Sequence, residues 1–298
     1  MSLSATTLSP ETRPEPPRAV RTSVRDRARA ASPRELLSVP WLAGLTPAER
    51  QQASSGLLVV EVMPGEALCR SGRAASYWFG VLEGLLRHSE PGDTGRPMRF
   101  GGVAPGGWCC EDTLLQRAPY RSDVRALRRS VVAALPLEDF HALLGSSLGF
   151  NQYLLLQLHE RLGQVDTLRD MERRSDPDLR VARHLAALSH PRLHPGVGDL
   201  LRITQQELGQ LVGLSRQRVN EALGRLETEH LIRVAYGGVQ VLNAGRLQQF
   251  GSPASAGPTA SMSASAETET AAAAAASSSQ EPLTPRTASA PAAAADTP

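Results

Sequence analysis

The chain of 298 residues contains no lysine, so all 32 of its basic side chains are arginines. Arginine, alanine, glycine and proline are abundant together, which is typical of a GC-rich genome, and part of the arginine count therefore reflects codon usage. The formal net charge is only +2. The charge balance alone does not indicate a nucleic acid partner, and the positions of the arginines carry more information than their number.

Cysteine is also scarce. The three cysteines are Cys69, Cys109 and Cys110, and none of them forms a C-x-x-C pair. An odd number without this spacing argues against a disulfide scaffold and is typical of a reducing cytoplasm. A self-contained iron–sulfur cluster on four cysteines is excluded as well. We expect Cys109 and Cys110 to fill a core, and a reactive thiol pair is the alternative.

Long hydrophobic runs are missing. No apolar run approaches the roughly 18 residues of a membrane-spanning helix, and the N-terminus lacks the apolar stretch of a secretory signal peptide. The hydrophobic fraction of 41% is nevertheless sufficient for real cores. We therefore expect a cytoplasmic protein of two modest domains with long tails and no membrane partner.

Both ends of the sequence lack a hydrophobic period. Residues 1–33 are rich in Ser, Thr, Pro and Arg, and residues 251–298 are rich in Ala, Ser, Thr and Pro. Such segments cannot bury enough apolar surface to offset the conformational entropy that folding removes. We interpret the first as a disordered basic arm and the second as a disordered tail.

Between residues 56 and 136, short apolar runs alternate with glycine turns. The strand candidates are residues 57–63, 77–86, 98–103 and 131–135. This spacing is typical of an antiparallel sandwich or barrel.

A long helix is predicted from Phe150 to about residue 174. Its apolar residues at alternating steps of three and four are Leu155, Leu158, Leu162 and Val165. This spacing is that of a coiled-coil seam. We expect the seam to join two copies of the chain, because Leu154 and Leu156 remain to cover the β-rich segment. The alternative is a helix that packs only on its own β-rich segment.

Residues 203–229 predict two short helices joined by a tight turn. Thr204 can cap the first helix together with Glu207, three residues on. Gly213 suits the left-handed residue that ends this helix, and Ser215 can cap the second helix. Such an arrangement is typical of a helix-turn-helix, whose second helix enters the DNA major groove. A packed helical hairpin with a solvated polar face is the alternative.

The second of these helices has a polar face that suits DNA. The predicted DNA-binding residues are Thr204, Ser215, Arg216, Gln217, Arg218, Asn220 and Arg225. Arg216 can fork onto a guanine, Gln217 can pair with an adenine, and Asn220 can reach a neighbouring base. The hydroxyls at the two helix starts suit phosphate oxygens.

The segment after this helix predicts a β-hairpin. Residues 231–234 and 239–242 are apolar runs on either side of Tyr236-Gly237-Gly238, which indicates two strands around a glycine turn. A helix-turn-helix followed by a hairpin is a winged helix.

Two stretches of the sequence resemble one known family. The run T-Q-Q-E-L-G-Q-L-V-G-L-S-R-Q-R-V-N-E-A-L-G-R-L-E, followed by L-I-R, resembles the DNA-binding domain of the Crp/Fnr family of bacterial transcription regulators. Upstream, M-P-G-E-A-L-C-R-S-G, Y-W-F-G-V-L-E-G-L-L-R and A-P-G-G-W resemble the β-roll of the cyclic-nucleotide-binding domain. The resemblance implies that the long helix is a dimer interface.

The resemblance also indicates where an effector would bind. Family members that bind cyclic nucleotides use a Gly-Glu-Leu run and an Arg-Ser pair. Here Cys110 takes the place of the glycine, Glu111 is in register with the ribose-binding glutamate, and Tyr120 takes the place of the arginine. The candidate effector pocket consists of Trp108, Cys110, Glu111, Arg121 and Ser122. Arg121 and Ser122 could hold a phosphate only if their loop slipped by one residue, so cyclic AMP is not the expected effector, and no cofactor or metal is assigned.

The predicted fold class is α+β. It comprises a disordered basic arm (1–33), an antiparallel, jelly-roll-like sensor β-roll (34–147), a long dimerisation helix (148–175), a winged helix-turn-helix (176–250) and a disordered Ala/Ser/Pro tail (251–298). The expected partners are double-stranded DNA, a second copy of the chain and, if the protein activates transcription, RNA polymerase.

Two rival functions stay open from the sequence. The first is a cyclic-nucleotide-responsive module that regulates a protein partner, against which the polar face of the second helix argues. The second is an enzyme built on a double-stranded β-helix, which would need a metal site such as two histidines and a carboxylate. The β-rich segment offers only His88, so we expect no enzyme.

Overall fold

The computed structural model describes residues 24–91, 97–172 and 176–251. Residues 1–23 of the predicted arm and 252–298 of the predicted tail lie outside these segments. No helix within them is long and apolar enough to cross a membrane.

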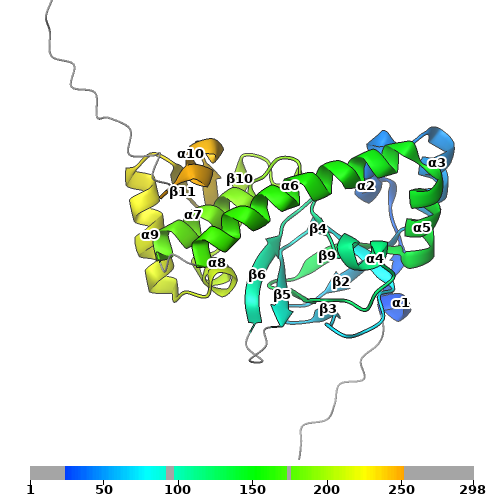
Figure 1. The fold of residues 1–298 in the computed structure, drawn as a ribbon, viewed down its shortest axis with the longest axis horizontal. Coiled ribbons are helices and arrows are strands. Elements are labelled where there is room, and N and C mark those ends of the chain that lie inside the picture. Colours follow the sequence, from blue (N-terminus) through cyan, green and yellow to red (C-terminus); the bar gives the residue numbers. More distant parts are fainter. Residues whose placement is uncertain (1–23, 92–96, 173–175, 252–298) are drawn as a thin grey trace, which may run out of the picture. The chain divides into compact units, whose positions relative to one another are not determined.

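The N-terminal half consists of two antiparallel sheets flanked by short helices (Figure 1). Its helices are α1 (Val24–Arg27), α2 (Pro33–Leu36), η1 (Pro40–Gly44), α3 (Pro47–Gly56), α4 (Glu111–Leu115) and α5 (Leu137–Ser146). Its strands are β1 (Arg29–Ala30), β2 (Leu58–Val62), β3 (Ala67–Cys69), β4 (Tyr77–Glu83), β5 (Leu86–Pro91), β6 (Pro97–Val103), β7 (Trp108–Cys109), β8 (Asp123–Ala126) and β9 (Ser130–Pro136). The sheet orders are β1-β2-β9-β4-β7 and β3-β8-β5-β6. The predicted β-roll is confirmed.

The sheet begins earlier than the sequence predicted. Residues 24–33, assigned to the disordered arm, form α1 and β1, and β1 pairs with β2. Arg29 also forms an ion pair with Glu35 (2.5 Å), whose backbone N–H is capped by Ser32. These contacts fix a segment whose own composition does not favour structure, and the prediction of disorder is wrong for these residues.

The predicted strand 77–86 is two strands with a turn at Gly84. Gly84 has a φ of +105°, and a Cβ there would lie 2.1 Å from the hydroxyl oxygen of Ser130. That hydroxyl accepts a hydrogen bond from Leu85 N (3.1 Å). Only glycine fits this turn, because any side chain would displace Ser130.

Aromatic rings form the centre of the first core. Trp78 packs at 4.4 Å from Trp108, measured between ring centroids, and Trp41 packs at 5.5 Å from Trp108. Phe140 of α5 and Phe150 of the next helix close the cluster with edge-on contacts. These contacts fix η1, α5 and the helix that carries Phe150 to the same core as β4 and β7.

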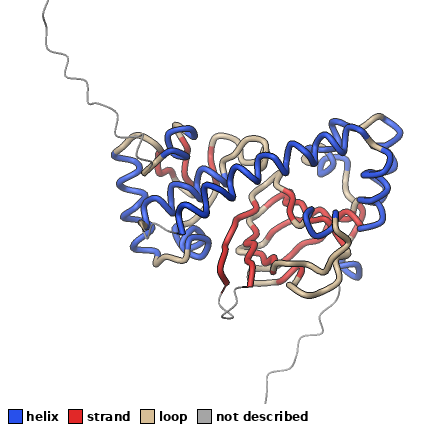
Figure 2. The backbone as a smooth tube through the Cα atoms, viewed as in Figure 1, coloured by secondary structure: helices blue, strands red, loops and turns tan. Residues whose placement is uncertain are grey.

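The C-terminal half contains the predicted long helix and winged helix (Figure 2). Its helices are α6 (Leu148–Glu172), α7 (Pro177–Leu188), α8 (Gln205–Val212), α9 (Arg216–Thr228) and α10 (Ala244–Gln249), and its strands are β10 (Leu200–Leu201), β11 (Ile232–Ala235) and β12 (Gly238–Val241). Asp176 caps α7 and Pro177 is its first residue. Strand β10, which was not predicted from the sequence, pairs with β12 and adds a third strand to the wing.

The second core includes side chains from both halves of the chain. Leu85 and Ala104 of the sensor half are fully buried among residues of α7, α8 and α9. Arg128, between β8 and β9, donates to the carbonyl oxygens of Gly84 (3.0 Å) and Arg202 (2.9 Å). It also forms an ion pair with Glu207 (3.3 Å). One guanidinium therefore joins the sensor half to the start of α8.

Candidate nucleic-acid interface and sensor cavity

The helix-turn-helix is fixed by local capping contacts. The hydroxyl of Thr204 accepts from Glu207 N (3.1 Å), and the Glu207 carboxylate accepts from Thr204 N (2.8 Å). Gly213 ends α8 with a φ of +69°. The hydroxyl of Ser215 accepts from Arg218 N (3.2 Å) at the start of α9. All four features were predicted from sequence, because each depends only on neighbours in the chain.

Helix α9 buries one face and exposes the other. Its buried residues are Val219, Ala222, Leu223 and Leu226. Arg216, Gln217, Asn220 and Glu221 are exposed on the opposite side. Three of these four residues are predicted base readers, so the fold presents them together on one helix face.

Two other predicted DNA-binding arginines are held by an aspartate that sequence analysis missed. Asp178, in the first turn of α7, is buried and forms ion pairs with Arg225 and, at 3.2 Å, with Arg218. Arg218 also pairs with Glu221 (2.8 Å). Arg218 and Arg225 therefore fix α9 to α7, and Glu221 holds a neighbouring arginine.

Gln205, the first residue of α8, was also missed. Its amide nitrogen donates to Asn220 Oδ1 (2.7 Å), and its Oε1 accepts from Arg216 Nε (3.4 Å). No sequence signal pointed to Gln205, because its two partners lie 11 and 15 residues further along the chain.

A cavity of about 320 Å³ lies on the sensor side of α6. Its walls come from β5, β6, the start of α4, α6 and α7, and its lining residues include His88, Gly102, Cys110, Glu111, Leu158, Arg161 and His184. His88 is therefore part of an internal wall, and burial lowers its pKa, with a further contribution from Arg161.

Arg161 is the charged group that sequence analysis missed in this cavity. Its Nε lies 2.6 Å from Glu111 Oε1, and its guanidinium also donates to the carbonyl oxygen of Trp108. Burial is the largest single influence on the pKa of Arg161 and lowers it, but the surrounding acidic groups, with Glu111 first and Asp112 among them, together outweigh burial, and the net pKa is raised. Glu111, which is 2% exposed, thus has an internal cation as its partner.

Cys110 adopts a backbone conformation that favours glycine. Its φ is +76°, at the N-cap of α4, and its side chain lines the cavity. All three cysteines are buried. A hydrogen bond with Cys110, followed by burial, raises the pKa of the Cys109 thiol. Because the thiolate is the reactive form, this environment favours the predicted role in the core over a reactive pair.

Tyr120, in place of the family's arginine, and the remaining predicted pocket residues Trp108, Arg121 and Ser122 lie elsewhere. The hydroxyl of Tyr120 accepts from Tyr77 N (2.9 Å) and donates to Tyr77 O (2.8 Å), so it holds the first residue of β4 in place. Arg121 is exposed and donates to Gln116 (2.6 Å). Ser122 and Trp108 are buried in the sensor half. The cavity is thus lined by Cys110 and Glu111 but not by the side chains of these other predicted residues.

The predicted seam on α6 is partly exposed in the single chain. Leu155 and Leu162 are 67% and 66% exposed, whereas Leu158 faces the larger cavity, whose lining Leu162 also joins. The side chain of Val165 lies outside the part of the structure that is described. Leu154 is buried in the sensor core, as expected, but Leu156 is not.

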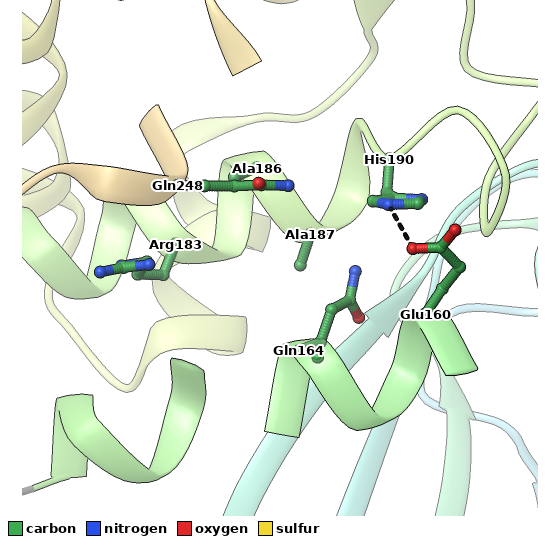
Figure 3. A pocket seen from close by; sticks show the side chains of 8 residues that line it. Glu160, Gln164, Arg183, Ala186, Ala187, His190 and Gln248 are labelled. Atoms are coloured by element: carbon green, nitrogen blue, oxygen red, sulfur yellow. Dashed lines mark ion pairs between the residues drawn. The ribbon is translucent and has the colours of Figure 1, made fainter. Parts of the chain in front are cut away.

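A second, smaller cavity of about 190 Å³ lies between α6, α7 and α10 (Figure 3). Glu160 on its rim forms ion pairs with His190 (3.3 Å) and Arg192 (3.0 Å). Gln164 lines this cavity as well as the larger one. Within the described segments, no group of three or more His, Cys, Asp and Glu side chains could hold a metal ion.

Two domain families match the chain. Residues 179–250 match the Crp-like helix-turn-helix domain, and residues 59–147 match the cyclic nucleotide-binding domain. These matches cover α7 to α10 and most of the two sensor sheets.

The chain is also similar to curated proteins and to a solved structure. The cyclic AMP receptor protein of Thermus thermophilus is 27% identical over 210 residues, which cover 70% of this chain and 95% of that protein. The transcriptional regulator SdrP of the same organism is 29% identical over 188 residues, with 60% and 86% covered. The crystal structure of the Thermus thermophilus catabolite activator protein aligns with 70% of this chain and 97% of its own at 27% identity, with a TM-score of 0.40. The chain belongs to the Crp/Fnr family of DNA-binding transcription regulators.

Proposed function

We propose that the protein is a homodimeric regulator that binds a pseudo-palindromic operator and reads it with α9. The observation that carries this proposal is the exposed face of α9, on which Arg216, Gln217 and Asn220 lie together behind a capped helix start. Forked and amide side chains at this end of a recognition helix match the hydrogen-bonding groups of base edges in the major groove.

The residues divide into readers, anchors and supports. Arg216, Gln217 and Asn220 read base edges. Thr204 and Ser215, at the starts of α8 and α9, contact phosphates and set the register of the domain on the duplex. Arg218 and Arg225 lie at the edge of this face and contact phosphates while Asp178 holds them against α7.

The dimer forms through α6. Leu155 and Leu162 are large apolar side chains exposed on one helix at coiled-coil spacing, and packing against the same residues of a second copy removes this surface from water. A twofold dimer places two α9 helices in successive major grooves, with half-site centres about 34–36 Å apart.

The effector is not a cyclic nucleotide. Glu111, in register with the ribose-binding glutamate, is paired with Arg161, and Cys110 places a side chain where the cyclic phosphate would approach. Tyr120, in place of the phosphate-binding arginine, is hydrogen-bonded to β4. Although relatives are named for cyclic AMP, the side chains of this cavity do not fit such a ligand.

The protein acts in the cytoplasm, without an enzymatic activity, and contacts RNA polymerase if it activates transcription. A genome-wide occupancy map followed by footprinting tests the proposal. We expect protected sites with two inverted half-sites one helical turn apart. Occupancy without a shared motif would contradict it.

A further inference from the structure

Gln205 connects two base-reading side chains that do not otherwise share a partner in the described part of the chain. It lies at the first position of α8, directly after the cap Thr204. From there its amide reaches across to α9, with Nε2 at 2.7 Å from Asn220 Oδ1 and Oε1 at 3.4 Å from Arg216 Nε. Gln205 is half-buried, while Arg216 and Asn220 are exposed.

The chemistry of these groups fixes the orientation of all three. A guanidinium has only donors, so the oxygen of Gln205 must face Arg216. Its amide NH₂ group then faces Asn220 and requires an acceptor there, which is Oδ1. The arginine thus determines the amide orientation of Gln205, and Gln205 determines that of Asn220.

This orientation limits what each reader can recognise. Because Oδ1 of Asn220 is turned toward Gln205, its Nδ2 group is the part that points away from Gln205 and can face DNA. A lone donor suits a purine N7, guanine O6 or thymine O4, whereas bidentate pairing with adenine needs both amide atoms. Similarly, the Nε of Arg216 is engaged, which leaves its two terminal nitrogens for the paired acceptors of guanine.

We propose that Gln205 is a positioning residue for DNA recognition, which makes Asn220 a hydrogen-bond donor to a base acceptor and directs the terminal nitrogens of Arg216 to guanine. The proposal rests on the proposed function, since it assumes that α9 reads DNA. It assigns no direct DNA contact to Gln205 itself. Loss of Gln205 should therefore change base preference at two positions rather than affinity for every sequence.

The experiment is an in vitro selection from duplexes with randomised half-sites, using the full chain. Wild type and Arg216→Ala first establish a motif and the base pair that Arg216 reads. In Gln205→Ala, preferences at the Arg216 and Asn220 positions should weaken by about 3- to 10-fold, the effect of one hydrogen bond. Gln206→Ala, one residue along α8, is the matched control and should keep the wild-type motif.

Gln205→Glu tests the orientation argument directly. A carboxylate accepts from Arg216 but cannot donate to Asn220, so Asn220 should turn its amide and present Oδ1 to the base. The preferred base at that position should then change to one that offers an amino group, adenine or cytosine. Arg216 should keep its guanine in this variant.

Three readouts separate the outcomes. Thermal melting should match wild type in both Gln205 variants, because the amide does not support the fold. Affinity for a scrambled duplex should match wild type in Gln205→Ala, whereas the added negative charge of Gln205→Glu should lower affinity for every duplex alike. Unchanged preferences at both positions in Gln205→Ala, or a uniform loss of affinity of this variant for all duplexes, would overturn the positioning role. No enriched motif with the wild-type chain would instead contradict the proposed function itself.

Discussion

Arg161 Nε lies 2.6 Å from Glu111 Oε1, so a cation of the chain itself neutralises the buried acid of the sensor cavity. The two residues come from different elements, α6 and α4. The pair joins α6 to the first residue of α4, at the wall of the larger cavity. It also supplies the positive charge that a buried carboxylate requires.

The first prediction concerns this ion pair. Arg161→Ala should lower the free energy of unfolding by about 1–3 kcal/mol, because Glu111 is left buried and unpaired. This range is below that of a fully buried pair, since the Arg161 side chain is 35% exposed. Adding Glu111→Gln should recover part of the loss. Urea denaturation measures the free energy of unfolding of the single and the double variant. Arg192→Ala, which breaks an exposed ion pair, is the control. Equal losses of stability in Arg161→Ala and Arg192→Ala would contradict a special role for Arg161.

The second prediction concerns assembly. Leu162→Glu should convert the dimer to a monomer, because two carboxylates would face each other across the seam. Operator affinity should fall with it, since a single half-site contact is weak. Leu148→Glu replaces an equally exposed leucine at the start of α6 and should stay dimeric. Sedimentation velocity distinguishes monomer from dimer for both variants. If Leu162→Glu remained a dimer, the proposal that α6 forms the dimer interface would be wrong.

The third prediction concerns pH. Burial lowers the pKa of His194 from 6.5 to about 3, with Arg161 as the next contributor. Between these two pH values the unfolded chain therefore binds one more proton than the folded chain. The contribution of neutral His194 to the free energy of unfolding is fully present above pH 6.5 and is lost as the pH falls toward 3. Through His194, the free energy of unfolding should change by at most about 1.4 kcal/mol per pH unit.

A variant can isolate this histidine. His194 Nδ1 lies 3.0 Å from the carbonyl oxygen of Ala187, so His194→Asn keeps a donor there without a titrating group. Its unfolding free energy should fall less steeply between pH 6.5 and 5 than that of wild type. Parallel pH profiles for the two proteins would assign the acid sensitivity to other groups.

The fourth prediction concerns Asp178. Asp178→Asn should release Arg218 and Arg225 from α7, which loosens α9 and removes the one negative charge that offsets their contacts with phosphate. Binding to any duplex should become more salt-dependent, with the slope of log K against log salt steeper by about 1, while operator binding weakens relative to a scrambled duplex. Exposed Asp199→Asn removes the same charge elsewhere and is the control. If the ratio of the affinities for the operator and the scrambled duplex were unchanged in Asp178→Asn, this role of Asp178 would be refuted.

Local signals made the DNA-binding half predictable. The cap at Thr204, the turn at Gly213 and the cap at Ser215 each depend on residues within one or two turns of helix. The apolar stripe of α9 follows from its period. By contrast, nothing in the local sequence distinguishes Gln205 and Asp178 from ordinary polar residues, because their hydrogen-bond and ion-pair partners lie far along the chain.

The sensor half was less predictable for the same physical reason. Glu111 was identified because it aligns with the family's ribose-binding glutamate. Arg161, in contrast, looks in the sequence like an ordinary polar residue of a coiled-coil helix, because its partner lies 50 residues earlier. Strand β1 is two residues long and is defined only by its pairing with β2. Pairing between distant segments leaves little trace in the local sequence.

The most direct test of the account is a fluorescence anisotropy titration of the wild-type chain against its footprinted operator and a scrambled duplex, with and without cyclic AMP. We predict that the operator binds at least about 1,000-fold more tightly than the scrambled duplex, with the same affinity in the presence and absence of the nucleotide. Equal affinity for both duplexes, or operator binding that requires cyclic AMP, would contradict it.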